Sequence, residues 1–218
     1  FADKVNTVSP SYADEIRTRE FGVMLEGVLR SRGADVSGII NGIDTAAFDP
    51  ASDPMIPVHY DASAPESKRA DKLALLEELG LSEIGADTPL IAMVSRMTGQ
   101  KGFDLVLGGF ERLMERNVGF VLLGTGDGRY EDAFRSLEQR YPGRFCAYIG
   151  YREDLSRRIY AGADFFLMPS AFEPCGLSQL IAQRYGTLPI VHEVGGLRDT
   201  VQPYDWSTGA GNGFSFRD

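Results

Sequence analysis

Cysteine and histidine, the residues that most often hold a metal or cross-link a chain, are scarce in this sequence. Two cysteines, Cys146 and Cys175, and two histidines, His59 and His192, occur among 218 residues. Their spacing fits neither a zinc site nor a redox pair. We therefore expect free thiols in a reducing compartment and no bound metal.

Long apolar runs and an excess of positive charge are also missing. No stretch approaches the roughly 18 apolar residues that a transmembrane helix needs, so no membrane partner is expected. Lys and Arg number 22 against 31 Asp and Glu, and the resulting net charge of −9 at pH 7 disfavours nucleic acid as a partner. An anionic ligand would therefore need a local group of cations.

The sequence has neither a methionine nor a secretion signal at its start, Phe1-Ala2-Asp3. We expect it to be a fragment of a longer protein. Its 43% hydrophobic and 24% charged residues are typical of a globular domain.

What the sequence does contain is a regular alternation of short apolar runs and helix-compatible segments. The runs lie at 90–94, 119–123, 145–149, 164–168, 188–191 and 213–216, and the helical segments at 66–79, 103–116, 130–140, 154–161 and 177–185. This alternation is typical of βαβ units, in which helices cover both faces of a parallel sheet. It predicts an α/β fold with a Rossmann-like, doubly wound sheet.

The first 65 residues follow a different pattern. Strands are predicted at 5–8 and 36–40, a helix from Ser9-Pro10 to Arg19, and a further helical stretch at 25–29. Residues 49–65 are rich in Pro, Asp, Ser and Ala and have no apolar period. We predict an N-terminal tail over 1–48, a linker over 49–65 and the α/β domain over 66–218.

The loop after the 90–94 strand carries two cations, Arg96 and Lys101, with a glycine on each side of Gln100-Lys101. A planar guanidinium and a mobile ammonium together can bind a diphosphate. The spacing around Lys101 is not that of a Walker A loop. A solvated turn with two surface cations is the alternative interpretation.

The loop after the 164–168 strand contains Glu173 and leads through Gly176 into a helix. The amides of Gly176, Leu177 and Ser178 would be unpaired donors at that helix start, which favours phosphate. Because a carboxylate beside a phosphate is unfavourable, Glu173 would serve another part of the ligand. A loop with a solvated Glu173 and a plain turn is the alternative.

Three further loops follow strands of the same predicted sheet. The Gly-rich stretch 124–128 is a near-miss of a dinucleotide fingerprint, because Arg129 stands where Gly or Ala is needed. Tyr151 could stack on a flat ring or simply pack. The pair Gly195-Gly196 would let the backbone approach a ligand, or would form a turn leading into a helix. Since all these loops share one edge of the sheet, we expect one ligand site there.

Together these segments resemble the bacterial glycogen synthases and plant starch synthases. The resemblance spans the chain and is carried by Ser-Arg-Met-Thr-Gly-Gln-Lys-Gly (95–102), Leu-Gly-Thr-Gly-Asp (123–127), Pro-Ser-Ala-Phe-Glu-Pro-Cys-Gly-Leu-Ser-Gln-Leu (169–180), Arg-Tyr-Gly-Thr-Leu-Pro (184–189) and Gly-Gly-Leu-Arg-Asp-Thr-Val (195–201), with Val-Ser-Pro-Ser-Tyr-Ala (8–13) and Ile-Asn-Gly-Ile-Asp (40–44) upstream.

The resemblance implies a GT-B fold, two Rossmann-like domains facing a cleft, and transfer of glucose from ADP-glucose to an α-1,4-glucan with retention and without a metal. The chain would be the C-terminal, donor-binding half, incomplete at its C-terminal end and preceded by the tail of the first domain. Alone it would be inactive, because the N-terminal GT-B domain with the family's catalytic histidine is missing. The implied location is the bacterial cytoplasm, or the plastid of a plant or alga.

The resemblance also implies roles for individual residues. Arg96 and Lys101 would bind the donor diphosphate, and the amides of Gly176, Leu177 and Ser178 the distal phosphate. Tyr151 would stack on adenine, and Gly195 and Gly196 would lie close to the substrate. Glu173 would contact glucose hydroxyls and offset positive charge at the anomeric carbon, with Cys175 lining that pocket.

The sequence departs from the family pattern in places. Ile181 stands eight positions after Glu173, where many retaining GT-B enzymes have a second Glu for the ribose. Phe48 replaces a usual tryptophan, and Val194 a usual threonine. A GT-B enzyme for UDP- or GDP-sugars and a non-catalytic nucleotide- or glucan-binding module remain the alternatives, whereas Arg129 disfavours a dehydrogenase.

Overall fold

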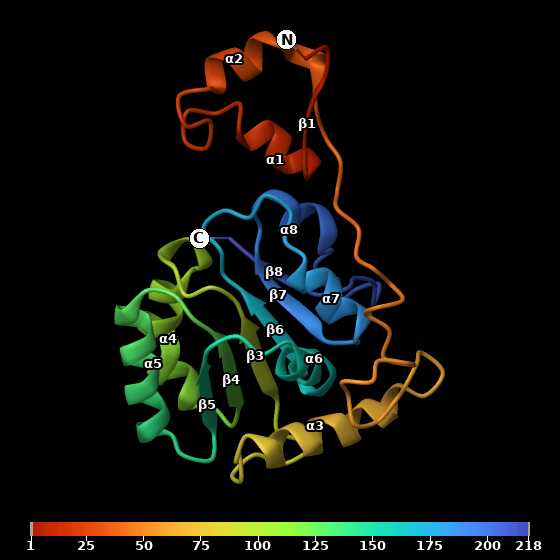
Figure 1. Ribbon diagram of the computed structural model, residues 1–218, viewed down its shortest axis with the longest axis vertical. Coiled ribbons are helices and arrows are strands. Elements are labelled where there is room, and N and C mark those ends of the chain that lie inside the picture. The colour runs from red at the N-terminus through yellow and green to blue at the C-terminus, as the bar shows by residue number, and fades with distance from the viewer. Residues whose placement is uncertain (1, 218) are drawn as a thin grey trace.

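The computed structural model describes residues 2–217, which form a small N-terminal part and a larger α/β body joined by an extended segment (Figure 1). The body is built on a six-stranded sheet of order β5-β4-β3-β6-β7-β8. Its strands are β3 (Leu90–Val94), β4 (Gly119–Gly124), β5 (Phe145–Ile149), β6 (Phe165–Met168), β7 (Leu188–His192) and β8 (Phe214–Phe216). Neighbouring strands are parallel throughout, which confirms the predicted fold class.

The order of the strands fixes where a ligand would bind. The chain adds β4 and β5 on one side of β3, then returns and adds β6, β7 and β8 on the other side. The reversal between β3 and β6 is the topological switch point, beyond whose carboxyl end open α/β sheets bind ligands. The loops after β3 and β6 are the ones that carry Arg96, Lys101 and Glu173.

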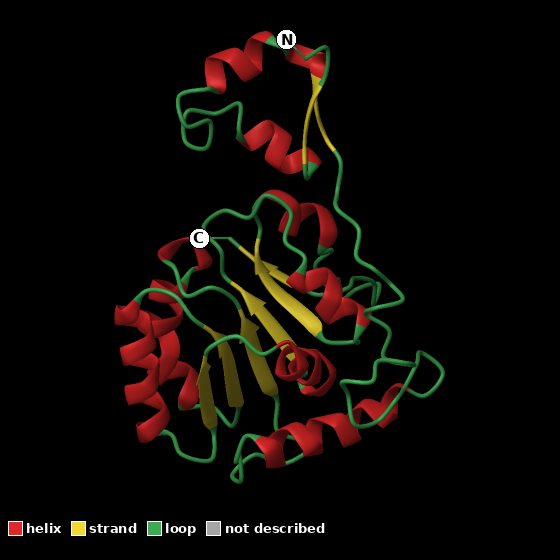
Figure 2. Cartoon of the chain, in the orientation of Figure 1, coloured by secondary structure: helices red, strands yellow, loops and turns green. Residues whose placement is uncertain are grey.

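Helices cover both faces of this sheet (Figure 2). The helices of the body are α3 (Lys68–Glu78), α4 (Phe103–Met114), α5 (Gly128–Arg140), α6 (Glu153–Gly162), α7 (Ser178–Arg184) and α8 (Gly195–Thr200), with 3₁₀ turns at η2 (Pro65–Ser67) and η3 (Gly99–Lys101). One apolar cluster joins α4 and α5 to β3–β5 through phenylalanines whose rings meet edge-on or tilted, among them Phe110, Phe120 and Phe145. The other joins α3, α6 and α7 to the opposite face through Leu75, Ile159 and others.

The N-terminal part is a two-stranded parallel sheet, β1 (Val5–Thr7) and β2 (Val36–Gly38), with α1 (Pro10–Glu15), α2 (Glu26–Ser31) and the 3₁₀ turn η1 (Gly33–Asp35). The predicted helix start is confirmed, since Ser9 Oγ accepts the Tyr12 amide at 3.0 Å and Pro10 follows it. The predicted end at Arg19 is wrong. Arg17 turns away to bind the carbonyls of Gly33 and Val36 at 2.9 and 2.8 Å, which diverts the chain after Glu15.

Other boundaries also differ from prediction. The second strand ends at Gly38 instead of residue 40. Helix α8 was not among the predicted helical segments, because two successive glycines at its start are poor helix formers, and a turn leading into a helix was only one of two interpretations for them. None of the helices among residues 2–217 is both long and apolar enough to cross a membrane.

The loop before β8 carries Trp206, which is 84% exposed and contacts Tyr204 edge-on at 4.9 Å between ring centroids.

The segment predicted as a linker, 49–65, has no regular structure before η2 begins at Pro65 but is anchored to the body. Ile56 and Tyr60 are buried in the α3–α6–α7 core. Asp53, 3% exposed, accepts a hydrogen bond from the Tyr185 hydroxyl and pairs with Arg157 at 3.5 Å. Burial, followed by the hydrogen bond to Asp53, raises the pKa of Tyr185. The domain division at this segment stays a prediction.

The Asp53 anchor yields a stability prediction. Asp53→Ala should lower the free energy of unfolding by about 1–3 kcal/mol, because the buried Tyr185 hydroxyl loses its acceptor and Arg157 keeps only Glu153, at 3.1 Å, as an ion-pair partner. Chemical denaturation monitored by circular dichroism measures this change. Glu66→Ala, at an exposed carboxylate in η2, is the control and should stay within about 0.5 kcal/mol of the wild type. Equal values for the two variants would contradict the anchor.

Candidate active site at the carboxyl edge of the sheet

The loops after β3 and β6 are held together as one unit. The Ala171 amide donates to the Gln100 carbonyl at 2.9 Å, and Gln100 Nε2 donates to the Phe172 carbonyl at 3.1 Å. Gly102 ends η3 in the left-handed region, at φ +75°, and a Cβ there would overlap the Pro169 carbonyl oxygen. Only glycine satisfies both conditions.

This packing brings Lys101 against Glu173. Lys101 Nζ lies 2.5 Å from Glu173 Oε2, and the two side chains are 16% and 8% exposed. Ser170 Oγ donates to the same carboxylate oxygen at 3.1 Å. The alternatives of a solvated Lys101 and a solvated Glu173 are therefore wrong. The buried ion pair and the hydrogen bond from Ser170 hold both charges in place. Lys101 can also bind a second anion, because an ammonium has three donors.

A cavity of about 360 Å³ lies at the carboxyl ends of β3, β4 and β5. Arg96, Thr125 and Tyr151 contribute to its wall. Arg96 is exposed, and its guanidinium makes no hydrogen bond or ion pair to any other residue between 2 and 217. Tyr151 is 82% exposed, so its alternative interpretation as a packing residue is wrong. A free guanidinium and a free aromatic face both border this cavity.

The opposite wall of the cavity comes from α6, α7 and the extended segment. Phe48 lies there, with the Arg157 guanidinium 3.8 Å from its ring centroid. Ile181 also lines the wall, which places the position of the absent second Glu beside the cavity. The structure thus puts two of the departures from the family pattern at the same cavity.

The Gly-rich loop after β4 continues the sheet pairing beyond the strand ends. Met97 N donates to the Thr125 carbonyl at 2.9 Å, and Asp127 N donates to the Met97 carbonyl at 2.8 Å. A Cβ at Gly124 would overlap the Ser95 carbonyl, and one at Gly126 the Met97 carbonyl. These glycines allow the loops after β3 and β4 to pack closely, without any dinucleotide fingerprint.

The start of α7 is where the phosphate-binding amides were predicted. Leu177 occupies the N-cap position and provides no side-chain acceptor for the first amides of the helix. Gly176 has φ +73°, and the buried Gln179 fixes the turn by donating to the Cys175 and Gly176 carbonyls at 2.9 and 3.0 Å. Ser178 is the first helical residue. Cys175 is 4% exposed, and burial raises the pKa of its thiol, so it packs as a neutral group.

The paired glycines after β7 do begin a helix, which confirms the second of the two interpretations given for them. They approach the protein's own backbone closely: a Cβ at Gly195 would overlap the Glu173 carbonyl oxygen, and one at Gly196 the backbone of Cys175. The Gly196 amide donates to the Glu173 carbonyl at 2.9 Å. Whether a substrate also approaches them stays a prediction.

Sequence reasoning missed residues that support these loops. Gln100 joins the loops after β3 and β6, Ser170 holds the Glu173 carboxylate within its own loop, and Gln179 fixes the turn before α7. All three lie inside the quoted motifs. Their polar type in otherwise apolar or glycine-rich segments is the only indication that the sequence provides, and it does not reveal their partners.

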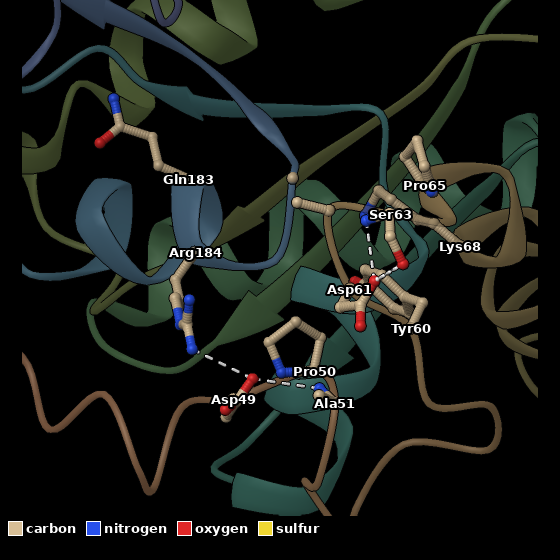
Figure 3. Close-up of a pocket in the computed structure, with 12 residues that line it drawn as sticks. Asp49, Pro50, Ala51, Tyr60, Asp61, Ser63, Pro65, Lys68, Gln183 and Arg184 are labelled. Carbon is tan, nitrogen blue, oxygen red and sulfur yellow. Dashed lines mark hydrogen bonds and ion pairs between the residues drawn. The ribbon is translucent and has the colours of Figure 1, made fainter.

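A larger cavity of about 830 Å³ lies elsewhere, between the 49–65 segment and α7 (Figure 3). Its charged groups pair with one another instead of pointing at a ligand: Arg184 contacts Asp49 at 3.1 Å, and Asp61 accepts from Ser63. Burial lowers the pKa of Lys68 to about 7, while its Nζ donates to two carbonyls and Thr187 Oγ1. The cavity at the carboxyl edge, with unpaired groups, is the better candidate.

Among residues 2–217 no three His, Cys, Asp or Glu side chains gather as metal ligands would. The Lys101–Glu173 centre and Arg96 instead provide fixed charges of both signs. The arrangement can neutralise a polyanion and present a carboxylate to a neutral, hydroxyl-rich group.

Comparison with known proteins identifies the family. Residues 88–214 match the model of the family described as "Glycosyl transferases group 1", and the chain belongs to this family. Residues 1–31 match a second model, "Starch synthase catalytic domain". The α/β body is therefore a glycosyltransferase domain.

Among individual proteins, the chain is similar to glycogen synthases. It is 53% identical over 216 residues to that of Streptococcus gordonii, covering 99% of this chain and 45% of the relative. To that of Geobacillus thermodenitrificans it is 53% identical over 215 residues, covering 99% and 44%. The chain thus spans about half the length of the curated relatives that it matches.

A solved structure agrees with this similarity. The catalytic domain of starch synthase IV from Arabidopsis thaliana, bound to ADP and acarbose, superposes with a TM-score of 0.93 at 39% identity, covering 100% of this chain and 45% of that one. Anabaena HepE, in complex with UDP and glucose, superposes at 0.66 with 19% identity, covering 100% and 50%, and shows the shared GT-B fold alone.

The contact at Gly102 yields a prediction. Gly102→Ala should separate the loops after β3 and β6, because the new Cβ overlaps the Pro169 carbonyl and φ is positive. A loss of about 1–3 kcal/mol in unfolding free energy is expected by chemical denaturation. Gly108→Ala, inside α4 with open space around it, is the control and should stabilise by about 0.5–1 kcal/mol. A Gly102→Ala protein as stable as the control would contradict the close packing.

Proposed function

We propose that this chain is the donor-binding half of an ADP-glucose-dependent glucan synthase. The complete enzyme would transfer glucose from ADP-glucose to the non-reducing end of an α-1,4-glucan, with retention and without a metal. The observation that carries the proposal is that Arg96 and the buried Lys101–Glu173 ion pair lie on the loops after β3 and β6, which meet at the switch point of the sheet. The similarity to glycogen synthases supports the same conclusion.

The two cations would bind the donor diphosphate. Arg96 is free to form a bidentate contact from the cavity wall. An arriving phosphate would share Lys101 with Glu173, and the uncapped start of α7, at Gly176, Leu177 and Ser178, would take the distal phosphate. When the bond to glucose breaks, negative charge collects on the leaving ADP. Once the donor is bound, both cations would face the leaving phosphate and stabilise this charge, so no metal would be needed.

Glu173 would act on the sugar side. Once Lys101 turns toward phosphate, the carboxylate can accept glucose hydroxyls and offset positive charge that develops at the anomeric carbon. Its backbone is held by Gly196 and its side chain by Ser170, so its orientation is defined before the donor arrives. The buried Cys175 would close the same pocket.

The cavity of about 360 Å³ is the proposed nucleoside site, with the exposed Tyr151 stacking on adenine. The binding of ADP and acarbose by the starch synthase IV structure supports ADP-glucose as donor and a glucan as acceptor. The ribose would face Ile181, an apolar side chain, so its hydroxyls would depend on backbone groups.

Other functions fit less well. A UDP- or GDP-sugar donor would use the same cations, so only the nucleobase preference distinguishes it. A non-catalytic binding module would have no physical need to bury the Lys101–Glu173 pair at the switch point of the sheet. The proposed enzyme works in the bacterial cytoplasm, or a plastid, and requires an N-terminal GT-B domain.

The donor assignment predicts nucleotide-selective binding. Calorimetric titration of the 218-residue chain should show tighter binding of ADP than of UDP or GDP. Arg96→Ala should weaken ADP binding about 10- to 100-fold, since charge-assisted hydrogen bonds to phosphate are lost. Arg112→Ala, at an exposed arginine on α4, should bind ADP as the wild type does. Equal affinity for the three nucleotides would contradict ADP-glucose as the donor.

The catalytic assignment predicts a turnover defect. In the complete enzyme, Lys101→Ala should reduce kcat by about 100-fold or more, because a preorganised charge near the leaving phosphate is lost. Radiolabelled glucose incorporation into glycogen measures this rate. Lys4→Ala, which removes an exposed lysine paired with Asp35, is the control. A Lys101→Ala enzyme with near-wild-type turnover would rule out the diphosphate role.

A further inference from the structure

Helices α1 and α8, separated by about 180 positions in sequence, pack against each other (Figure 1). The Ser11 amide and hydroxyl donate to Asp199 at 2.9 and 2.6 Å. Glu15 Oε1 accepts the Gly195 amide at 2.7 Å. Each helix uses two positions four residues apart, which lie on one face. The pairing of 11 with 199 and of 15 with 195 means that the helices run antiparallel.

In this contact each helix caps the N-terminus of the other. Val194, the N-cap residue of α8, has no side-chain acceptor, and Glu15 provides a carboxylate at the first amide of the helix. Ser11 is the second residue of α1, and Asp199 provides the carboxylate there. Helix N-termini have unpaired amides and favour negative charge, so both carboxylates stabilise the docked arrangement.

The capped turn of α8 leads directly to Glu173. Gly195 and Gly196 are pressed against the backbone of residues 173–175, where no Cβ fits. The Gly196 amide holds the Glu173 carbonyl at 2.9 Å. A connected path of contacts thus runs from Glu15 through the first turn of α8 to the carboxylate that pairs with Lys101.

Two further observations concern Glu15. Its second oxygen, Oε2, is buried and has no hydrogen-bond partner among residues 2–217, which is an unfavourable arrangement for a residue that serves stability alone. In addition, α1 lies in the stretch matched by the starch synthase model, and α8 in the stretch matched by the group 1 model. The reciprocal caps therefore join the two matched regions of the chain.

We propose that Glu15 is a positioning residue: docking of α1 onto α8 through the Glu15 and Asp199 caps sets the first turn of α8 and thereby the working position of Glu173. The inference rests on the proposed function, in which Glu173 faces the sugar. The proposed base site depends less on this docking, because no residue of α8 lines the cavity that Arg96 and Tyr151 border. Glu15 thus affects transfer more than ADP affinity.

The test is a split between turnover and nucleotide binding. In the complete enzyme, Glu15→Ala should lower kcat on the order of 10- to 100-fold, the effect of a displaced reacting group. The Kd for ADP should change less than kcat does, because no residue of α8 lines the cavity that Arg96 and Tyr151 border. Glu15→Gln keeps an acceptor at the same position and should recover most of kcat. Asp199→Ala, at the other cap, should show the same kcat-specific loss.

Asp14→Ala is the matched control, since this neighbouring carboxylate on α1 is 79% exposed and pairs with Arg17 instead of α8. It should leave kcat unchanged. A Glu15→Ala enzyme with wild-type kcat, or a loss in which kcat and ADP affinity fall together, would overturn the proposal. If the wild-type enzyme transfers no glucose, the proposed function itself fails, and the exchange experiment below still tests the docking.

Amide hydrogen exchange on the 218-residue chain provides a readout without activity. Glu15→Ala should speed exchange at Gly195 and Gly196 and leave β3 and β4 protected, and Glu15→Gln should not. If Glu15→Ala also lowers protection in β3 and β4, the whole fold is destabilised and a milder variant is needed. Ser11→Ala removes only one hydrogen bond of the second cap. It should speed exchange at Gly195 and Gly196 by a smaller factor. Unchanged exchange at both glycines would overturn the docking role.

Discussion

The close approach of two loops across the switch point of the sheet is the constraint on which the site depends. Where Gly102 meets the Pro169 carbonyl, the chain after β3 and the chain after β6 share one small volume. The distance between the two loops decides whether Lys101 reaches Glu173. The ion pair then fixes the positions of one positive and one negative charge in the site. If the two loops moved independently, Lys101 and Glu173 would be solvated, and their ion pair would contribute little to stability.

The strands and most helices of the body could be predicted because the pattern of apolar and polar residues within each segment is enough to indicate them. β3 and β5 are apolar runs bounded by polar or turn residues, and they occur where the pattern places them. The extent of helix α8 could not be predicted, although a turn into a helix was one interpretation, because its first turn is made of two glycines and its cap comes from Glu15, far upstream. In the same way, the early end of α1 results from Arg17 binding carbonyls near β2.

The site shows the same limit. In a parallel sheet the loops after the strands all lie at the carboxyl edge, where ligands bind. Arg96, Tyr151 and Glu173 could therefore be assigned to one region from the sequence. Their partners could not, since Ser170 and Gln100 are ordinary polar residues until the loops meet. Residue types indicate which chemistry is available, whereas pairing depends on contacts between segments that the sequence pattern leaves independent.

Trp206 has a consequence for spectroscopy. It is the one tryptophan in the sequence, it is largely exposed, and it lies on the loop that leads into β8, away from the loops that follow β3 and β6. Intrinsic tryptophan emission from this chain therefore reports on the β8 edge of the sheet, and we expect it to change little when a ligand enters the proposed nucleotide cavity. That makes it an internal reference: a ligand that alters this emission is acting on the fold at a distance, or binding a second surface.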